Sequence, residues 1–182
     1  MNLLNNETRY GSLSIGLHWL MLLLIVVAYA TIELREFFPK GSDPREALKM
    51  WHFMIGLSVL LLVAVRLALR LTSPTPRIEP VLPKWQKILS DLMQVLLYLF
   101  MFSMPILGWL VLSGEGKPIP FFGLQLPALI GENKDAASLY QEVHETIGTI
   151  AYFLVGFHAA AALFHHYFVR DNTLKRMLPG RN

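Results

Sequence analysis

Four long apolar segments separated by polar stretches form the main pattern of this chain of 182 residues. They cover residues 15–32, 50–69, 88–112 and 146–169. At about 1.5 Å per residue, a helix of about 20 apolar residues crosses a hydrocarbon core of about 30 Å. The second segment reaches this length because Arg66 can extend its long side chain to the interface. The pattern predicts an all-α fold, an integral membrane four-helix bundle that forms a single domain over residues 1–182.

The composition favours lipid over water as the main solvent. Hydrophobic residues make up 54% of the chain and charged residues only 16%, and the mean hydropathy is +0.44. The absence of cysteine excludes disulfides, thiolate zinc sites, iron–sulfur clusters, cysteine nucleophiles and covalently attached c-type haem. The basic residues lie mostly beside the apolar segments, a pattern typical of membrane proteins. No nucleic-acid partner is therefore expected, although the net charge is +3.

The distribution of lysine and arginine predicts the orientation in the membrane. Cytoplasmic loops carry the excess of these residues, and ten lie on the side of the two termini against six on the other. Both termini are therefore expected in the cytoplasm. The ten are Arg9, Arg66, Arg70, Arg77, Lys84, Lys87, Arg170, Lys175, Arg176 and Arg181, and the six are Arg35, Lys40, Arg45, Lys49, Lys117 and Lys134.

All six histidines lie in or at the ends of the predicted spans, where an ionisable ring is costly unless it has a function or a partner. His144 and His158 are 14 residues apart, which is about 40° short of four full turns and about 21 Å along one helix. His52 lies near the outer end of the second span, and His18 near the inner end of the first. We therefore expect His52 to pair with His144 outside, and His18 with His158 inside.

Two histidines at one depth fill both axial positions of a haem iron, an arrangement that suits electron transfer. Without cysteine the haems must be non-covalent, so the spacing predicts two haem b groups. Glycines near the four histidines (Gly16, Gly56, Gly148 and Gly156) would leave room for a flat macrocycle. His165 lies seven residues after His158 on the same face, and it remains an alternative inner ligand. The other interpretation places His165 and His166 in the interfacial belt.

Two further side chains share faces with these ligands. Arg66 follows His52 by 14 residues, so it is a candidate partner for a haem propionate at the inner level. The alternative is an ordinary inner-leaflet arginine. Tyr29 lies about 20° off the face of His18 and could approach the outer haem, although a belt tyrosine is the favoured interpretation.

Several segments resemble the bacterial cytochrome b561 family. They are Leu17-His18-Trp19, Arg35-Glu-Phe-Phe-Pro-Lys40, the helix from His144-Glu-Thr to Gly156-Phe-His158-Ala-Ala-Ala, and the tail with His165-His166-Tyr167-Phe168, Asp171-Asn-Thr-Leu174 and Arg176-Met177. The resemblance implies a four-helix, di-haem protein of the bacterial inner membrane. It implies that the ligands of the haem iron are His18, His52, His144 and His158, and thus favours His158 over His165.

The resemblance is strongest to family members that oxidise superoxide and reduce ubiquinone. It implies that superoxide gives electrons to the outer haem and that a quinone in the membrane accepts them. Basic residues of the outer loops could steer the superoxide anion, unless the interleaved acids cancel them: Arg35, Lys40, Arg45, Lys49 and Lys117. Candidate quinone contacts at the inner end of the third span are Ser90, Asp91 and Gln94.

Two other functions remain open. Related cytochromes b serve hydrogenases and formate dehydrogenases, so the chain could be an electron-relay subunit of a partner dehydrogenase. The outer loops and the tails are short, which favours a self-contained enzyme, so a protein partner is possible but not required. A haem-free ion or proton carrier would use the same histidines and would be colourless.

Overall fold

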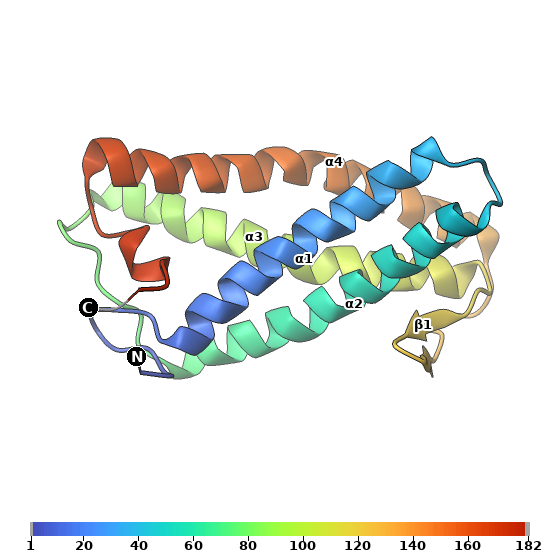
Figure 1. Ribbon diagram of the computed structural model, residues 1–182, viewed down its shortest axis with the longest axis horizontal. Helices are drawn as coiled ribbons and strands as arrows, with labels where there is room; N and C mark the ends of the chain where they lie inside the picture. Colours follow the sequence, from blue (N-terminus) through green and yellow to red (C-terminus); the bar gives the residue numbers. More distant parts are fainter. Residues whose placement is uncertain (1, 181–182) are drawn as a thin grey trace.

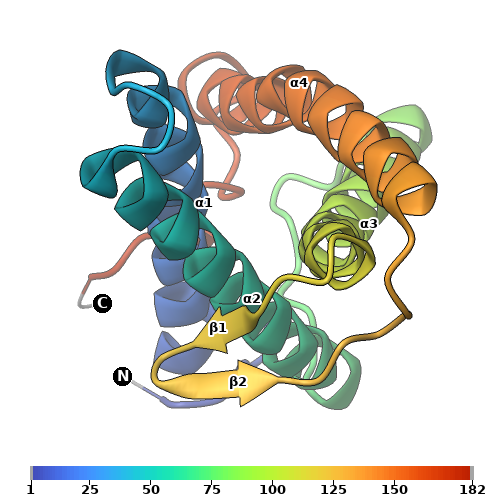
Figure 2. The same cartoon turned by 90° about the vertical axis from the view of Figure 1, so that its right-hand side faces the viewer.

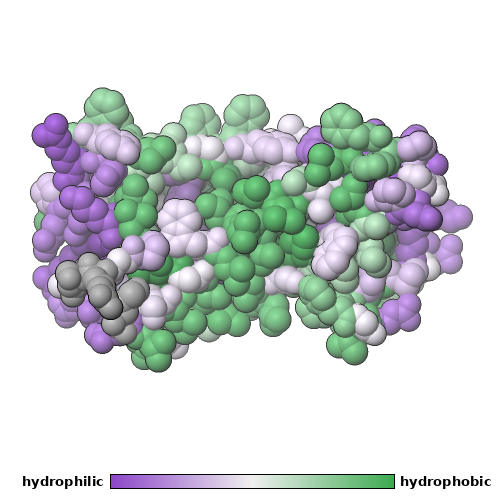
Figure 3. All heavy atoms as spheres, viewed as in Figure 1, coloured by the Kyte–Doolittle hydropathy of each residue, from purple (hydrophilic) through white to green (hydrophobic). Residues whose placement is uncertain are grey.

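The computed structural model describes residues 2–180 and consists mainly of four long helices (Figure 1). The helices are α1 (Ser12–Leu34), α2 (Asp43–Thr72), α3 (Lys84–Gly114) and α4 (Lys134–Phe164). Each is long and apolar enough to cross a membrane. Hydrophobic side chains gather over the middle of the molecule and hydrophilic ones at both ends (Figure 3). The predicted four-helix membrane bundle is therefore confirmed.

The helices pack in sequence order, α1 along α2, α2 against α3, and α3 along α4. A core cluster of Met21, Val59 and Val63 joins α1 to α2, and side chains of α3 such as Tyr98 and Phe102 pack against it. The α1 and α4 backbones approach each other at few points. Side chains rather than close backbones therefore connect these two helices.

The helices extend beyond the apolar segments from which they were predicted. The fourth was expected from residue 146, but α4 begins at Lys134. The Asn133 side chain accepts a hydrogen bond from the amide of Ala136, and Asp135 lies in the first turn. An N-cap and an early acid both stabilise a helix start, so the helix includes polar turns that hydropathy does not detect.

A small hairpin lies at the end of the bundle opposite the chain termini, and we call this end the hairpin end. Strands β1 (Ile119–Phe121) and β2 (Leu124–Leu126) pair antiparallel, in front of α2 (Figure 2). Ile119 is buried against Leu57 and Leu112. The short helix η1 (Arg35–Phe37) follows α1 directly and begins the connection to α2 at the same end. The sequence analysis did not predict the hairpin.

Both chain termini lie at the opposite end, which we call the terminal end (Figure 1). Here the C-terminal tail folds back, through η3 (Lys175–Met177), onto the N-terminal segment and the α2–α3 loop. The amide of Asn172 donates to the carbonyl of Glu79 at 3.1 Å, and Trp19 Nε1 donates to the carbonyl of Met177 at 2.8 Å. The Arg176 guanidinium donates to the Pro76 carbonyl. These bonds close the terminal end of the bundle.

Candidate haem-binding site

The structure brings four histidines together as two pairs at two levels of the bundle. The ring centres of His18 and His158 lie 6.2 Å apart, and those of His52 and His144 lie 6.1 Å apart. The ring planes make angles of 69° and 74°. One ring of each pair comes from α4, and these are the pairs that helical spacing predicts.

The separation within each pair fits a metal ion bound between two imidazoles. Two metal–nitrogen bonds of about 2 Å, plus the distance from each nitrogen to its ring centre, place the ring centres about 6 Å apart. Residues 2–180 contain no group of three or more histidine, cysteine or acidic side chains that could hold a metal ion. Each level therefore offers two protein ligands, and a macrocycle such as a porphyrin would supply the others. The residues fit haem.

The neighbours of the hairpin-end pair orient its rings. His52 Nδ1 lies 2.9 Å from the carbonyl oxygen of Ala28 on α1. A carbonyl oxygen can only accept, so Nδ1 carries the hydrogen and Nε2 is left for a metal. On the other side, a Cβ at Gly108 would lie 3.6 Å from Cε1 of His144. The small residue lets the α3 backbone approach that ring closely.

Space lies beside the glycines near the four histidines. A Cβ built at Gly16, Gly56 or Gly156 would meet no atom within 4 Å. A Cβ at Gly148 would meet only Met104 Cε, at 3.4 Å. Gly56 and Gly148 follow His52 and His144 by four residues on the same helical faces, so the space there suits a macrocycle, whereas Gly16 and Gly156 are exposed.

Arg66 lies at the level of the terminal-end pair. Its charge acts on both His18 and His158, and its Nη1 lies 3.4 Å from the carbonyl oxygen of Ser14. That hydrogen bond is long, so the guanidinium keeps most of its donors for another acceptor. This placement suits a carboxylate such as a haem propionate.

Two tyrosines connect α1 to α4 close to the hairpin-end pair. Tyr29 donates to the carbonyl of Gly148 at 2.7 Å, and Tyr152 donates to Glu33 Oε1 at 2.9 Å. The two rings lie 4.3 Å apart. Tyr29 thus makes a hydrogen bond between α1 and α4. Sequence spacing placed it near the outer level, but the crossing of the two helices could not be predicted.

Most of the bases expected to steer superoxide are in ion pairs. Arg35 and Arg45 both bind Glu36, with nitrogen–oxygen distances of 2.9 Å. The Arg45 side chain is 9% exposed and also donates to the Arg35 and Phe38 carbonyls, so it holds the connection between α1 and α2 together. Lys49 pairs with Glu46 and Lys117 with Glu115. Within residues 2–180, Lys40 is the member of this set without an ion pair.

The three candidate quinone contacts do not share one environment. Asp91 is exposed and forms an ion pair with Lys87 at 2.7 Å. Ser90 and Gln94 are half-buried, with Gln94 Nε2 3.5 Å from Ser90 Oγ. Two of the three residues thus remain near each other as polar groups on the inward side of α3.

His165 takes no part in either pair. Its Nδ1 lies 2.5 Å from Oδ2 of Asp171, a residue that is 1% exposed. Burial of this carboxyl favours its neutral form, but hydrogen bonds from Thr173 and His165 outweigh that effect and lower the pKa of Asp171 below its usual value. The burial of Asp171 could not be predicted, because nothing local to residue 171 in the sequence indicates it.

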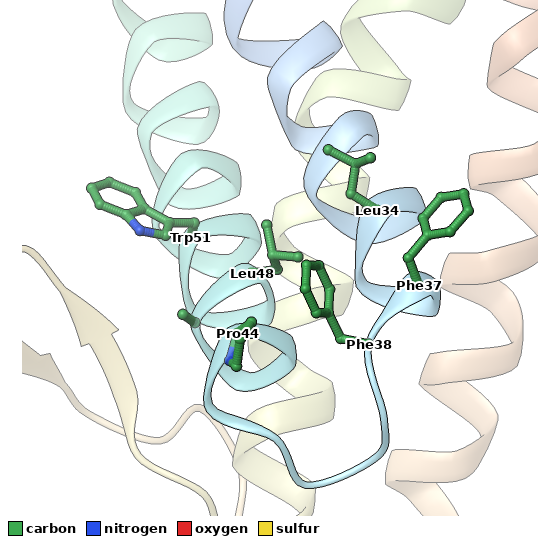
Figure 4. Close-up of a pocket in the computed structure, with 7 residues that line it drawn as sticks. Leu34, Phe37, Phe38, Pro44, Leu48 and Trp51 are labelled. Carbon is green, nitrogen blue, oxygen red and sulfur yellow. The ribbon is translucent and has the colours of Figure 1, made fainter.

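An open apolar groove of about 500 Å³ lies where α1 and η1 meet the start of α2 (Figure 4). It contains none of the six histidines. The lining is entirely apolar, so the groove lacks the hydrogen-bond donors that a quinone head group needs. Its labelled residues are Leu34, Phe37, Phe38, Pro44, Leu48 and Trp51.

Comparisons with known proteins agree with this geometry. A family profile described as prokaryotic cytochrome b561 matches residues 9–180. "Cytochrome b561 homolog 1" of Escherichia coli K12 is 38% identical over 95% of this chain and 98% of its own length. "Probable superoxide oxidase CybB" of Yersinia pestis is 39% identical over 94% of this chain and 96% of its own. "Cytochrome b562" of Cereibacter sphaeroides is 28% identical over 98% of this chain and its own full length.

The family match covers nearly all of the chain, including all four helices. Together with the apolar bundle, it indicates a bacterial inner-membrane protein. The chain belongs to the prokaryotic cytochrome b561 family, whose members are membrane oxidoreductases that bind haem b and transfer electrons.

Proposed function

We propose that this protein binds two haem b groups, one between His18 and His158 and one between His52 and His144. The observation that carries the proposal is the pair of imidazole separations, 6.2 and 6.1 Å. When bound, haem supplies one-electron redox chemistry at each level. The chain's own contribution is to hold both axial positions, fix the tautomer of His52 through Ala28 and leave space beside its glycines.

We further propose that the protein is a superoxide:quinone oxidoreductase. Two superoxide ions give up two electrons and leave as dioxygen, while one quinone takes the two electrons and two protons and leaves as quinol. Support comes from the relative named as a probable superoxide oxidase, at 39% identity over nearly the whole chain. His52 and His144 would hold a haem at the hairpin end, and the bound haem would supply one-electron chemistry to superoxide arriving there.

In the proposed orientation the hairpin end faces the periplasm and the terminal end the cytoplasm. Lys40, free of an ion pair in residues 2–180, is the residue placed to attract superoxide. Arg66 neutralises a propionate at the terminal-end level. Ser90 and Gln94 offer hydrogen bonds to a quinone within the membrane.

The cofactor proposal is tested by the dithionite-reduced minus air-oxidised spectrum of the detergent-purified protein, with the haem content per chain. We expect two haem b per chain, and about one in His52→Ala or in His18→Ala. The two variants should lose different halves of the spectrum. One haem per chain in the wild type, or a colourless protein after haem supplementation, would contradict the proposal.

The reaction is tested by mixing the purified protein with superoxide and ubiquinone. We expect quinol to form in step with superoxide loss, at one quinol per two superoxide ions. Superoxide that fails to reduce the bound haem, in a protein that a partner dehydrogenase reduces readily, would instead support the alternative of an electron-relay subunit.

A further inference from the structure

A buried carboxylate at the terminal end pairs with a histidine directly after the end of α4. Asp171 is 1% exposed, and its Oδ1 accepts from the amide of Thr173 at 2.8 Å. Its Oδ2 lies 2.5 Å from Nδ1 of His165, whose side chain is 18% exposed. An unpaired buried charge is costly, so the histidine is the group that makes this burial tolerable.

The backbone adopts two uncommon conformations to form this contact. Residues His165–Val169 form a π-helix, and Arg170 follows with φ +61°. A left-handed conformation is uncommon for a residue other than glycine, and single π-turns occur frequently at functional sites. The chain then turns back so that the amide of Asp171 donates to the carbonyl of His165 at 3.2 Å. The local structure thus returns the carboxylate to the histidine.

His165 lies beyond the terminal-end pair on the same helix. It follows His158 by seven residues, about 10 Å along the axis. With Nδ1 held by Asp171, Nε2 is the ring nitrogen left to exchange a proton. Neither residue belongs to the two histidine pairs.

The packing of α3 on α4 places the candidate quinone contacts between the levels of His158 and His165. Gly108 lies against His144, and Met104 lies against Gly148. The two helices therefore run antiparallel, and each step of four residues towards the start of α3 matches a step of four residues towards the end of α4. Continued along both helices, this register puts Gln94 level with His158 and Ser90 between the levels of His158 and His165.

We propose that the His165–Asp171 pair delivers a proton to the quinone bound near Ser90 and Gln94. The inference rests on the proposed function and adds a donor for its protons. As the quinone receives an electron, its carbonyl oxygen takes the proton from His165 Nε2. Asp171 keeps the Nδ1 hydrogen bond and stabilises the charged ring, and water at the terminal end replaces the proton. Over the full reaction the quinone takes two electrons, originally from superoxide, and two protons.

Other charged groups face this pair from each neighbouring segment. Arg176 of η3 acts on Asp171 by its charge, and its guanidinium lies 5.6 Å from the ring of Tyr10. On α3, the same register brings Lys87 level with His165, and Lys87 is neutralised by Asp91. In the π-helix, His166 follows His165 directly, and its buried Nδ1 has no hydrogen bond within residues 2–180. His165 is therefore the histidine of this segment with a carboxylate partner.

The test separates haem reduction by superoxide, which needs no proton, from quinone reduction, which does. His165→Gln and Asp171→Asn are purified with haem, and two rates are followed: haem reduction by superoxide, and ubiquinone reduction. We expect haem reduction at the wild-type rate and quinone reduction slowed about tenfold or more. The dependence of quinone reduction on pH should flatten because the donor has been removed, and its slowing in D₂O should increase because proton delivery then limits the rate. His166→Gln is the matched control and should leave both rates unchanged.

Each outcome decides the matter. Wild-type quinone reduction in His165→Gln with an unchanged pH profile would overturn the proposal. Asp171→Asn also loosens the tail and could therefore lose haem. In that case His165→Gln, which keeps the bond from Thr173 to Asp171, decides. Loss of the haem spectrum in both variants would make the pair purely structural and would likewise overturn it. A wild-type protein that reduces no quinone would instead refute the proposed function itself.

Discussion

Lys40 and Lys49 lie close in sequence but differ in what their charges can do. Lys49 is neutralised by Glu46 at 2.7 Å, whereas Lys40 has no ion pair within residues 2–180. An incoming anion is attracted by uncompensated charge, over about 10 Å at ordinary ionic strength. The unpaired Lys40, rather than all the bases of the hairpin end together, should therefore raise the rate at which superoxide reaches the protein.

We predict that Lys40→Glu lowers the rate constant for haem reduction by superoxide severalfold at low salt and less at high salt. The control removes the neutral ion pair as a whole: Glu46→Gln combined with Lys49→Gln should change the rate constant little, because the net charge stays the same. Rapid mixing of the two variants with superoxide at two salt concentrations measures this. Equal effects in both variants would show that the charge of Lys40 does not attract superoxide more than the paired bases do.

Asp171 makes the stability of the tail dependent on pH. The pKa of Asp171 lies below its usual value of about 3.9, so the carboxylate stabilises the folded tail at neutral pH. This contribution is present above about pH 4 and is lost as the pH falls through the lower pKa of the folded state.

We predict that hydrogen exchange in residues 170–178, corrected for intrinsic rates, accelerates as the pH falls below about 4. In Asp171→Asn the same segment should exchange faster at pH 6 and show less dependence on acid. A peptide from the core around Val59 and Val63 serves as the internal control for global unfolding. Identical pH profiles in wild type and variant would contradict the role of Asp171.

At the scale of elements, α3 approaches α4 closely at two glycines, which differ in the space available for an added Cβ. A Cβ at Gly114 would lie 3.0 Å from both Asn133 O and Ala137 Cβ, where the backbone itself cannot move away easily. A Cβ at Gly108 would lie 3.6 Å from the His144 ring, an ordinary contact distance. The start of α4 is therefore the tighter junction.

We predict that Gly114→Ala destabilises the protein by about 1–3 kcal/mol, since overpacking forces the backbone apart. Gly108→Ala should be neutral or slightly stabilising, because alanine is the better helix former. Thermal melting in detergent, followed by circular dichroism, measures both. A melting temperature in Gly114→Ala equal to that of Gly108→Ala would show that the junction relaxes freely.

At the scale of the molecule, the two ends carry opposite charge. The hairpin end has six bases and nine acids, and the described part of the terminal end has nine bases and four acids. Part of the acidity comes from the polar turns of α4 that hydropathy did not detect, with Asp135, Glu142 and Glu145. The positive-inside rule counts lysine and arginine rather than net charge, so the proposal that the terminal end faces the cytoplasm rests on nine bases against six and not on the acids.

We predict that a fluorescent protein fused to the C-terminus of the full chain is bright in cells. Alkaline phosphatase fused at the same point should be inactive, since it requires export. The reverse pair of results would place the terminal end in the periplasm and invert the proposed direction of electron flow.

The four helices and the two histidine pairs could be predicted because both follow from periodicity along single helices. Hydropathy identified the spans, and the turn angle placed His144 and His158 on one face. The helix α4 begins several turns before the predicted apolar span, because capping by Asn133, not hydropathy, starts that helix.

The remaining features depend on contacts between distant segments. Burial of Asp171 requires the π-helix and the return of the tail, and the ion pairs of Arg35 and Arg45 depend on how the α1–α2 connection folds. The hairpin is a short pairing of only three residues in each strand. No local pattern identifies such contacts, because they depend on three-dimensional proximity.

The two histidine levels also have an electrical consequence. They are separated by about 21 Å along α4, about two thirds of a hydrocarbon core. In the proposed orientation, an electron that passes from one level to the other moves towards the negative side of an energised membrane. That movement costs about 1.5 kcal/mol for every 100 mV of membrane potential. Superoxide removal would therefore slow in well-energised cells and accelerate when an uncoupler collapses the potential.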